Sequence, residues 1–225
     1  MSDDSDVIEP TPKLEHFGPL AGWSDARLLE VSRDTRAWFT HDKEGHVIGD
    51  WEDTRCHLPI LYAIARSVSW PYPTHKLPLQ FPPRMMEIGV RHGVATLALL
   101  QACKETNGRL TSLEISEEFA TVALERVEAA GLSEYWTLSL TNSNDYTSGP
   151  LDLLWIDGDH SYEQCKRDVE NHAPKVRPGG YVLMHDAWNV LEPGVPVVID
   201  EMRATGRYEM CVLEFSYGLA ICRVK

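Results

Sequence analysis

Residues 81–98 read FPPRMMEIGVRHGVATLA, and this stretch decides the fold of the chain. Arg84–Ile88 is a short, mainly apolar run that predicts a buried strand, and residues 89–93 carry two glycines that predict a tight turn. The alanine and leucine pattern over 94–103 predicts a helix whose first N–H groups face that turn. The stretch therefore predicts a strand, a turn and a helix in direct succession.

The turn has features of a nucleotide-binding unit. Gly89 and Gly93 allow a ligand to lie against bare backbone. Glu114 follows a second predicted strand, over 110–113, at a position from which an acid can hydrogen-bond ribose hydroxyls. The turn lacks one glycine of the G-x-G-x-x-G pattern, and Arg91 stands in its place. A glycine turn with a purely structural role is the alternative interpretation.

Strands and helices alternate through the rest of the chain. Ser116 and Ser161 are placed to cap helices, and the remaining predicted elements are strands over 135–140, 151–156 and 181–184, a turn over 177–180, a helix over 195–204, and strands over 208–213 and 218–224. The last two strands predict a hairpin. This order predicts an α/β fold with a doubly wound, mostly parallel, Rossmann-like sheet and a terminal antiparallel hairpin, which binds ligands at the carboxyl ends of its strands.

Three regions are predicted along the chain. Residues 1–12 are acidic and without periodicity, and predict a disordered tail. Residues 13–80 predict an N-terminal extension of helices and loops, with a helix beginning at Ser24, a loop or hairpin over 41–51, a helix over 53–68 and a proline-rich connector over 70–83. This extension either covers the substrate side or packs on the sheet. Residues 81–225 form the predicted nucleotide-binding domain.

Composition limits the function classes. The chain has 225 residues, 43% of them hydrophobic, and no apolar run near the roughly 18 residues that a membrane span needs. Its start lacks a signal-peptide pattern, so a cytoplasmic location is expected. The five cysteines form no C-x-x-C pair and predict reduced, mostly buried thiols. A formal charge of −13 disfavours nucleic acid and anionic membrane surfaces as partners.

Polar side chains follow two neighbouring strands of the predicted sheet. Asp157, Asp159 and His160 come after the strand over 151–156, and His185 and Asp186 come after the strand over 181–184. A single Asp after a strand commonly caps the next helix, and a single His is commonly an ordinary polar residue. Because these residues reach one edge of the sheet together, they predict a catalytic site.

The acid two residues before the turn adds a family resemblance. Glu87, the Gly89 to Gly93 turn and the acid after the next strand resemble motif I and the ribose-binding acid of class I S-adenosylmethionine-dependent methyltransferases. The resemblance implies S-adenosylmethionine as cofactor, with Glu87 at its amino-acid end and Glu114 on its ribose. The cofactor residues that it implies are Glu87, Gly89, Gly93, Glu114, Asn142, Ser143 and Asp157. Asn142 and Ser143 lie where this fold contacts the adenine, although loop residues of this kind are also commonly just solvated.

The downstream cluster carries a second resemblance. Asp157-x-x-His160 followed by His185-Asp186 resembles the metal-dependent sugar O-methyltransferases of macrolide antibiotics and the cephalosporin hydroxylase proteins. It implies that Asp157 and Asp186 bind a divalent metal, that His185 replaces an acidic ligand, and that His160 is the general base. Mg²⁺ prefers oxygen ligands and imidazole suits transition metals, so both remain candidates.

These patterns predict an S-adenosylmethionine-dependent O-methyltransferase that acts on a hydroxyl of a small natural-product or sugar-like acceptor. An iron-dependent oxygenase that uses His160, His185 and a carboxylate is one alternative. A domain that binds S-adenosylmethionine without turnover is another. The expected partner is the small-molecule acceptor, and a homo-oligomer is compatible with the sequence.

Overall fold

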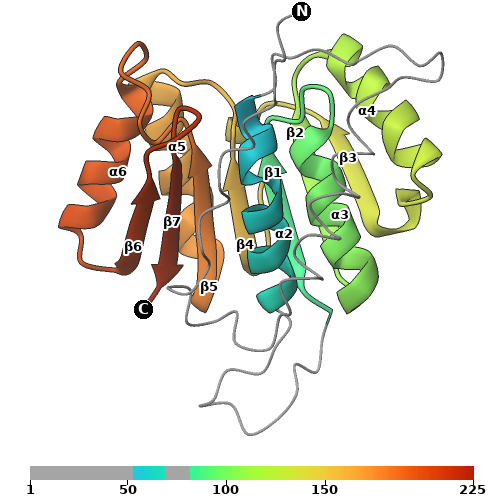
Figure 1. The fold of residues 1–225 in the computed structure, drawn as a ribbon, viewed down its shortest axis with the longest axis horizontal. Helices are drawn as coiled ribbons and strands as arrows, with labels where there is room; N and C mark the ends of the chain where they lie inside the picture. Colours follow the sequence, from blue (N-terminus) through green and yellow to red (C-terminus); the bar gives the residue numbers. More distant parts are fainter. Residues whose placement is uncertain (1–52, 69–81) are drawn as a thin grey trace, which may run out of the picture.

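The computed structural model describes residues 53–68 and 82–225, and its centre is a seven-stranded sheet in the order β3-β2-β1-β4-β5-β7-β6 (Figure 1). The strands are β1 Arg84–Ile88, β2 Arg109–Glu114, β3 Trp136–Leu140, β4 Leu151–Ile156, β5 Val176–His185, β6 Tyr208–Leu213 and β7 Leu219–Val224. Every pair up to β4–β5 is parallel, and β7 runs antiparallel to both of its neighbours. The predicted α/β fold with a terminal hairpin is confirmed.

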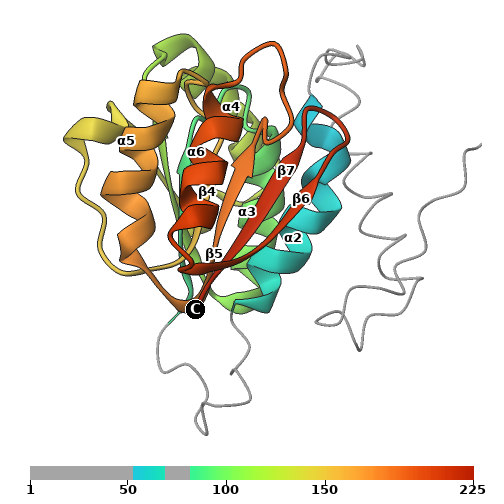
Figure 2. The same ribbon diagram turned by 90° about the vertical axis from the view of Figure 1, so that its left-hand side faces the viewer.

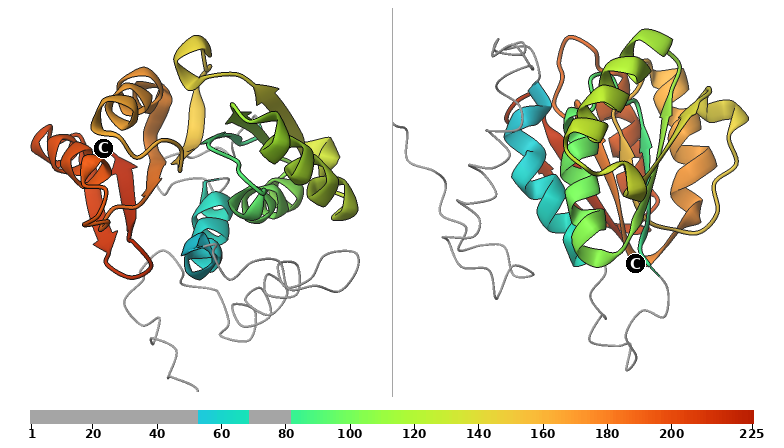
Figure 3. Two further views of the ribbon diagram at one scale, coloured as in Figure 1. Left: turned by 90° about the horizontal axis from the view of Figure 1, so that it is seen from above. Right: turned by 90° about the vertical axis from the view of Figure 1, so that its right-hand side faces the viewer.

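Helices cover both faces of the sheet (Figures 2 and 3). The helices α2 Leu58–Ser67 and α3 Val94–Thr106 pack on one face together with α4 Glu117–Ala129, whereas α5 Tyr162–His172 and α6 Gly194–Ala204 pack on the other. Short 3₁₀ turns complete the described elements: η2 Asp53–His57, η3 Ser133–Tyr135, η4 Ser143–Asp145 and η5 Ala173–Lys175. Each helical layer therefore buries one face of every central strand, which explains their nearly continuous apolar sequence.

Local sequence signals fix the helix ends. The hydroxyls of Ser116 and Ser161 accept hydrogen bonds from the N–H groups of the third helical residues, as the sequence predicts for N-caps. Pro59 stands in the first turn of α2, a position that suits proline, and the preceding residues form η2 in place of a longer α-helix. None of the helices in 53–68 and 82–225 is long and apolar enough to cross a membrane.

Two other predictions need comment. The predicted turn over 177–180 lies inside β5 as an irregularity, because Val176 pairs with Leu151 while Tyr181 pairs with Leu153. The backbone of Gly180 lies so close to that of β4 that a Cβ there would be 2.6 Å from the Asp152 carbonyl oxygen. The predicted tail, the helix from Ser24, the loop over 41–51 and most of the proline-rich connector lie outside the described residues.

The direction of winding reverses between β1 and β4. From β1 the chain adds β2 and β3 on one side, and then crosses to place β4 on the other. The N–H of Asp157 donates to the carbonyl of Ile88 at 2.9 Å, so the carboxyl ends of these two strands lie side by side. Open α/β sheets bind ligands at such a switch point.

Candidate functional site

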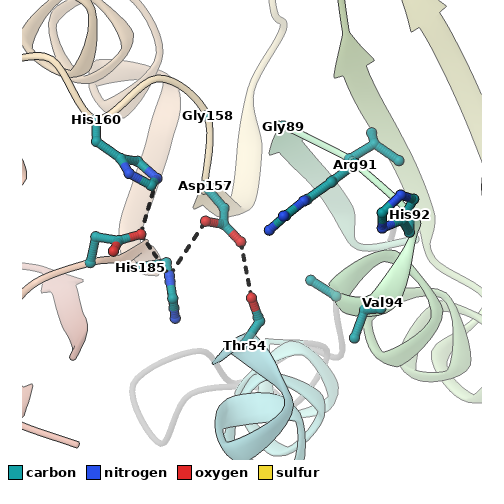
Figure 4. Close-up of a pocket in the computed structure, with 12 residues that line it drawn as sticks. Thr54, Gly89, Arg91, His92, Val94, Asp157, Gly158, His160 and His185 are labelled. Atoms are coloured by element: carbon teal, nitrogen blue, oxygen red, sulfur yellow. Dashed lines mark hydrogen bonds and ion pairs between the residues drawn. The ribbon is translucent and has the colours of Figure 1, made fainter. Parts of the chain in front are cut away.

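A cavity of about 260 Å³ opens at this switch point (Figure 4). It is bounded by the glycine turn, the start of α3, the ends of β4 and β5, and η2. The residues that line it are Thr54, Gly89, Val90, Arg91, His92, Val94, Ala95, Asp157, Gly158, His160, His185 and Asp186. The structure thus brings together the glycine turn and the polar residues after β4 and β5, as the order of the strands predicts.

The glycine turn approaches the end of β4 closely. Gly89 has a φ of +86°, and a Cβ at this position would lie 2.1 Å from the carbonyl oxygen of Asp157. Gly93 has a φ of +78° and is the N-cap of α3. Gly89 is therefore required because of both the space and the backbone conformation. Gly93 is required mainly because of its backbone conformation. Their contact with a cofactor stays a prediction.

The carboxylate of Glu114 accepts hydrogen bonds from the backbone of the glycine turn. Its Oε2 accepts hydrogen bonds from the N–H groups of Val90 and Arg91 at 3.1 and 2.9 Å, and its Oε1 accepts from Ile115 and Ser116 at 2.8 and 2.9 Å. These bonds orient the backbone of the turn. A ribose hydroxyl would share or replace the bonds to Oε2, so the predicted ribose contact requires the carboxylate to adjust.

Glu87 lies in the interior and does not line the cavity, and its predicted contact with the amino-acid end of a cofactor stays a prediction. Its carboxyl group is fully buried and accepts hydrogen bonds from the hydroxyls of Thr96 and Ser112. Burial raises the pKa of Glu87 from 4.5 to about 8, although both hydroxyl bonds act in the other direction. Glu87 therefore connects β1, β2 and α3 beneath the turn.

The buried Glu87 gives a prediction on stability. Between pH 4.5 and about 8 the folded chain keeps a proton on Glu87 that the unfolded chain has lost. The free energy of unfolding should therefore fall as the pH rises through this window, by at most about 1.4 kcal/mol per pH unit. Glu87→Gln, which mimics the protonated acid, should flatten this slope in denaturant titrations at pH 5 to 8. Equal slopes for both proteins would contradict a raised pKa.

The loop after β3 contains both a buried and an exposed polar residue, and its predicted contact with adenine stays a prediction. Ser143 was predicted to contact adenine, but its hydroxyl is buried, donates to Asp168 at 2.5 Å and accepts from Gln164 at 3.1 Å. His172 contacts the Ser143 carbonyl at 3.1 Å. Asn142 is exposed, and its side chain accepts from the backbone of η4. The side chain of Ser143 thus fixes η4 on α5, whereas Asn142, Asn144 and Asp145 are exposed at the surface of this loop.

The residues after β4 and β5 form one hydrogen-bonded group. His160 places Nε2 at 3.0 Å from Oδ2 of Asp186, and His185 places Nδ1 at 2.8 Å from the same oxygen. Nδ1 of His185 is also 3.5 Å from Oδ1 of Asp157. Two carboxylates and two imidazoles therefore meet at the ends of β4 and β5, where they line the cavity.

The loop between β5 and α6 holds this group in place. Asn189 donates to Oδ1 of Asp186 at 2.8 Å, and Glu192 places Oε2 at 2.6 Å from Nδ1 of His160. Burial alone would raise the pKa of Asp186, but the hydrogen bond and charge of His185 and the charge of His160 outweigh it and hold that pKa below its ordinary value. Asp186 is therefore an ionised carboxylate in a buried position.

Three of these residues fit a divalent metal ion. One ligand atom from each of Asp157, His160 and Asp186 lies within 4.8 Å of the others. The predicted set had His185 as the third ligand, but in the described part of the chain the geometry groups His160 with the carboxylates. One imidazole with two carboxylates also differs from the two-His, one-carboxylate set expected of an iron oxygenase.

Sequence reasoning missed residues that η2 and the loops bring to the site. The hydroxyl of Thr54 donates to Oδ2 of Asp157 at 3.4 Å. His57 is buried, its Nε2 contacts the carbonyl of Phe215 at 3.1 Å, and its ring lies 5.2 Å from that of His185. Burial, reinforced by the charge of His185, lowers the pKa of His57 to about 4. The T-x-x-H spacing on a predicted helix was a visible but unspecific signal.

Comparison with known proteins finds similar methyltransferases. Residues 86–187 match a family model described as a methyltransferase domain. A methyltransferase from Podospora anserina, solved with bound S-adenosylhomocysteine (SAH), is 17% identical with a TM-score of 0.59, and 92% of each chain is covered. An O-methyltransferase from Bacillus cereus in complex with SAH is 19% identical with a TM-score of 0.58, covering 90% of this chain and 92% of that one.

One further structure and one sequence relative are similar. A candidate caffeoyl-CoA O-methyltransferase from Staphylococcus aureus is 14% identical with a TM-score of 0.60, covering 88% of this chain and 92% of that one. The uncharacterized protein y4gI from Sinorhizobium fredii is 44% identical over 43 residues. That match covers 19% of this chain and only 5% of the Sinorhizobium protein.

Proposed function

We propose, since the chain carries a class I S-adenosylmethionine-dependent methyltransferase domain, that it transfers the methyl group to a hydroxyl oxygen of a small natural-product or sugar-like acceptor. The observation that carries this proposal is the position of His160. Its side chain lines the cavity next to the glycine turn, and the residue also lines an open groove of about 650 Å³. A base between a donor site and an acceptor site is what O-methylation requires.

The groove supports a polar acceptor. It is lined by Asp159, Ser161, Tyr162 and Glu192 together with His160, Pro193 and Gly194. Carboxylate, hydroxyl and phenol groups can hydrogen-bond several hydroxyls of one ligand. These groups can contact the hydroxyls of an acceptor, while apolar atoms make up the larger part of the groove's surface.

The proposed reaction needs one proton acceptor. The acceptor hydroxyl gives its proton to Nε2 of His160, its oxygen forms a bond to the methyl carbon, and the carbon–sulfur bond breaks to leave neutral SAH. Glu192 faces Nδ1 of His160 and can hold a proton there. Nε2 lies 3.0 Å from the carboxylate of Asp186, so the acceptor hydroxyl has to take the place of that contact before Nε2 can accept its proton. After the transfer, the protonated Nε2 donates a hydrogen bond to Asp186, whose negative charge stabilises the imidazolium.

A divalent metal ion is part of the proposal. Asp157 and Asp186 would hold it through their carboxylate oxygens, which lie close together, while His160 acts as the base and not as a ligand. Such an ion lowers the pKa of a bound hydroxyl. Since both carboxylate oxygens and an imidazole nitrogen are present, Mg²⁺ and a transition metal both fit the donor set.

Calorimetric titration with SAH tests the donor site. Wild type should bind SAH, and Glu114→Gln should weaken binding by about 1 to 3 kcal/mol if a ribose hydroxyl loses a charged acceptor. Because Glu114 also supports the turn, the 2′-deoxy analogue of SAH is the matched control. The variant should lose affinity for SAH and little for the analogue. An equal loss for both ligands would mean that Glu114 acts through the turn alone, and tight NAD binding without SAH binding would overturn the proposed function.

A further inference from the structure

Arg91 occupies an unusual position for a long charged residue. It stands in the glycine turn with a φ of +48°, in the left-handed region that favours glycine. Its N–H donates to Glu114 at 2.9 Å, which holds the backbone in this conformation. Figure 4 shows its side chain extending from the turn over the cavity toward Asp157. The backbone of the turn therefore directs a guanidinium group to the mouth of the cavity.

The charges on the cavity wall are unequally distributed. Among the lining residues in 53–68 and 82–225, Arg91 is the one with a permanent positive charge. Of its neighbours at the cavity, His92 has an imidazole, whereas Val94 and Ala95 have no polar side-chain atom, and α3 has no acid in its first turn. The cavity is also lined by two carboxylates, that of Asp157 next to Gly89 and that of Asp186 at the end of β5. An anionic group in this cavity is therefore attracted to Arg91 and repelled by these two carboxylates.

S-adenosylmethionine has one anionic group, the carboxylate of its methionine part. We propose that Arg91 binds this carboxylate and so orients the donor, with its amino-acid end along the glycine turn. This inference rests on the proposed function. A planar guanidinium can bind both oxygens of a carboxylate with charge-assisted hydrogen bonds. Arg91 is thus a binding residue that selects an α-carboxylate, in a turn where the glycine pattern would place no side chain.

A binding role of Arg91 can be distinguished by experiment from a role that only shapes the turn. A cation that binds the carboxylate matters only for ligands that have one. S-adenosyl-3-thiopropylamine lacks that carboxylate and keeps the adenosine, the sulfur and the amino group of SAH. The two ligands differ only in this carboxylate, so comparing their affinities tests whether the Arg91 side chain binds it.

The test is calorimetric titration of Arg91→Asn, Arg91→Lys and wild type with both ligands. Asn tolerates the left-handed conformation, so this variant removes the charge without straining the turn. We expect Arg91→Asn to weaken SAH binding by about 10- to 100-fold and S-adenosyl-3-thiopropylamine binding by less than about 2-fold. Arg91→Lys should restore part of the affinity for SAH. Arg167→Asn, at an exposed position on α5, is the control for the loss of one positive charge.

The outcomes are distinct. A selective loss of SAH binding in Arg91→Asn, absent in Arg167→Asn, supports the proposal. An equal loss for both ligands means that Arg91 acts through the turn, and unchanged SAH affinity means that it makes no contact; either result overturns the proposal while leaving the proposed function in place. If wild type binds neither ligand, the donor site itself is wrong.

Discussion

Replacing His160 with alanine is expected to lower kcat by about 10²- to 10⁴-fold, the usual range for the loss of a positioned general base. The reason is its place between the cavity and the groove, with both ring nitrogens near carboxylates. Without the imidazole the acceptor hydroxyl has to lose its proton to water. The measurement is methyl transfer from labelled S-adenosylmethionine under saturating donor and acceptor.

The same variant carries its own controls. His160→Ala should bind SAH within a few-fold of wild type, since no contact with the glycine turn is removed. Added imidazole should restore part of the turnover, because it can enter the space that the side chain leaves. Full turnover in His160→Ala would exclude His160 as the base, and the base would then have to lie elsewhere on the wall formed by the ends of β4 and β5.

The second large effect concerns the metal. Exhaustive treatment with EDTA should abolish turnover of the wild type, and a divalent ion should restore it. Asp186→Asn should lower turnover by about 10³-fold, the loss expected when several kcal/mol of charge stabilisation disappear. The largest loss is expected at Asp186 because its carboxylate contacts His160, His185 and Asn189 at once. Metal analysis of the purified protein identifies the ion.

A surface carboxylate provides the control for this experiment. Asp200→Asn, on the exposed side of α6, should keep wild-type turnover and its sensitivity to EDTA. If wild-type turnover survives EDTA, Asp157 and Asp186 are not metal ligands. Their remaining role would be to orient and charge-stabilise the imidazole of His160. Tightly bound iron without methyl transfer would instead favour the oxygenase alternative.

The sheet could be predicted from sequence because its signals are local. Each central strand is a short apolar run bounded by a turn, and Ser116 and Ser161 mark helix starts by their side-chain chemistry. The resemblance to class I methyltransferases is confirmed by the family match over 86–187. The meeting of residues after β4 and β5 followed from topology alone, because neighbouring parallel strands end at the same edge.

Side-chain orientation could not be predicted in the same way. Glu87 and Ser143 are polar residues next to the expected cofactor, yet both bind buried partners on other elements. Sequence spacing gives the strand on which an acid lies, but not the hydroxyl that reaches it from a neighbouring helix. Thr54 and Glu192 reach the site from segments far apart in the chain, so no local pattern shows that they meet there.

The cysteines also show which properties can be predicted from local sequence and which depend on packing. All five are free thiols, as their spacing predicts, with three buried and Cys56 and Cys211 exposed. The lack of a C-x-x-C pair can be read directly from the sequence. Which thiols reach the surface depends on the packing of η2 and of the edge strand β6, which the sequence states only indirectly.

The most direct test of the account is a crystal structure of the protein with SAH and a divalent metal ion. The account predicts SAH along the turn from Gly89 to Gly93, with its carboxylate on Arg91 and its sulfur facing His160. It also predicts the ion between Asp157 and Asp186. SAH bound elsewhere, or bound here with its sulfur turned away from His160, would contradict methyl transfer at this site.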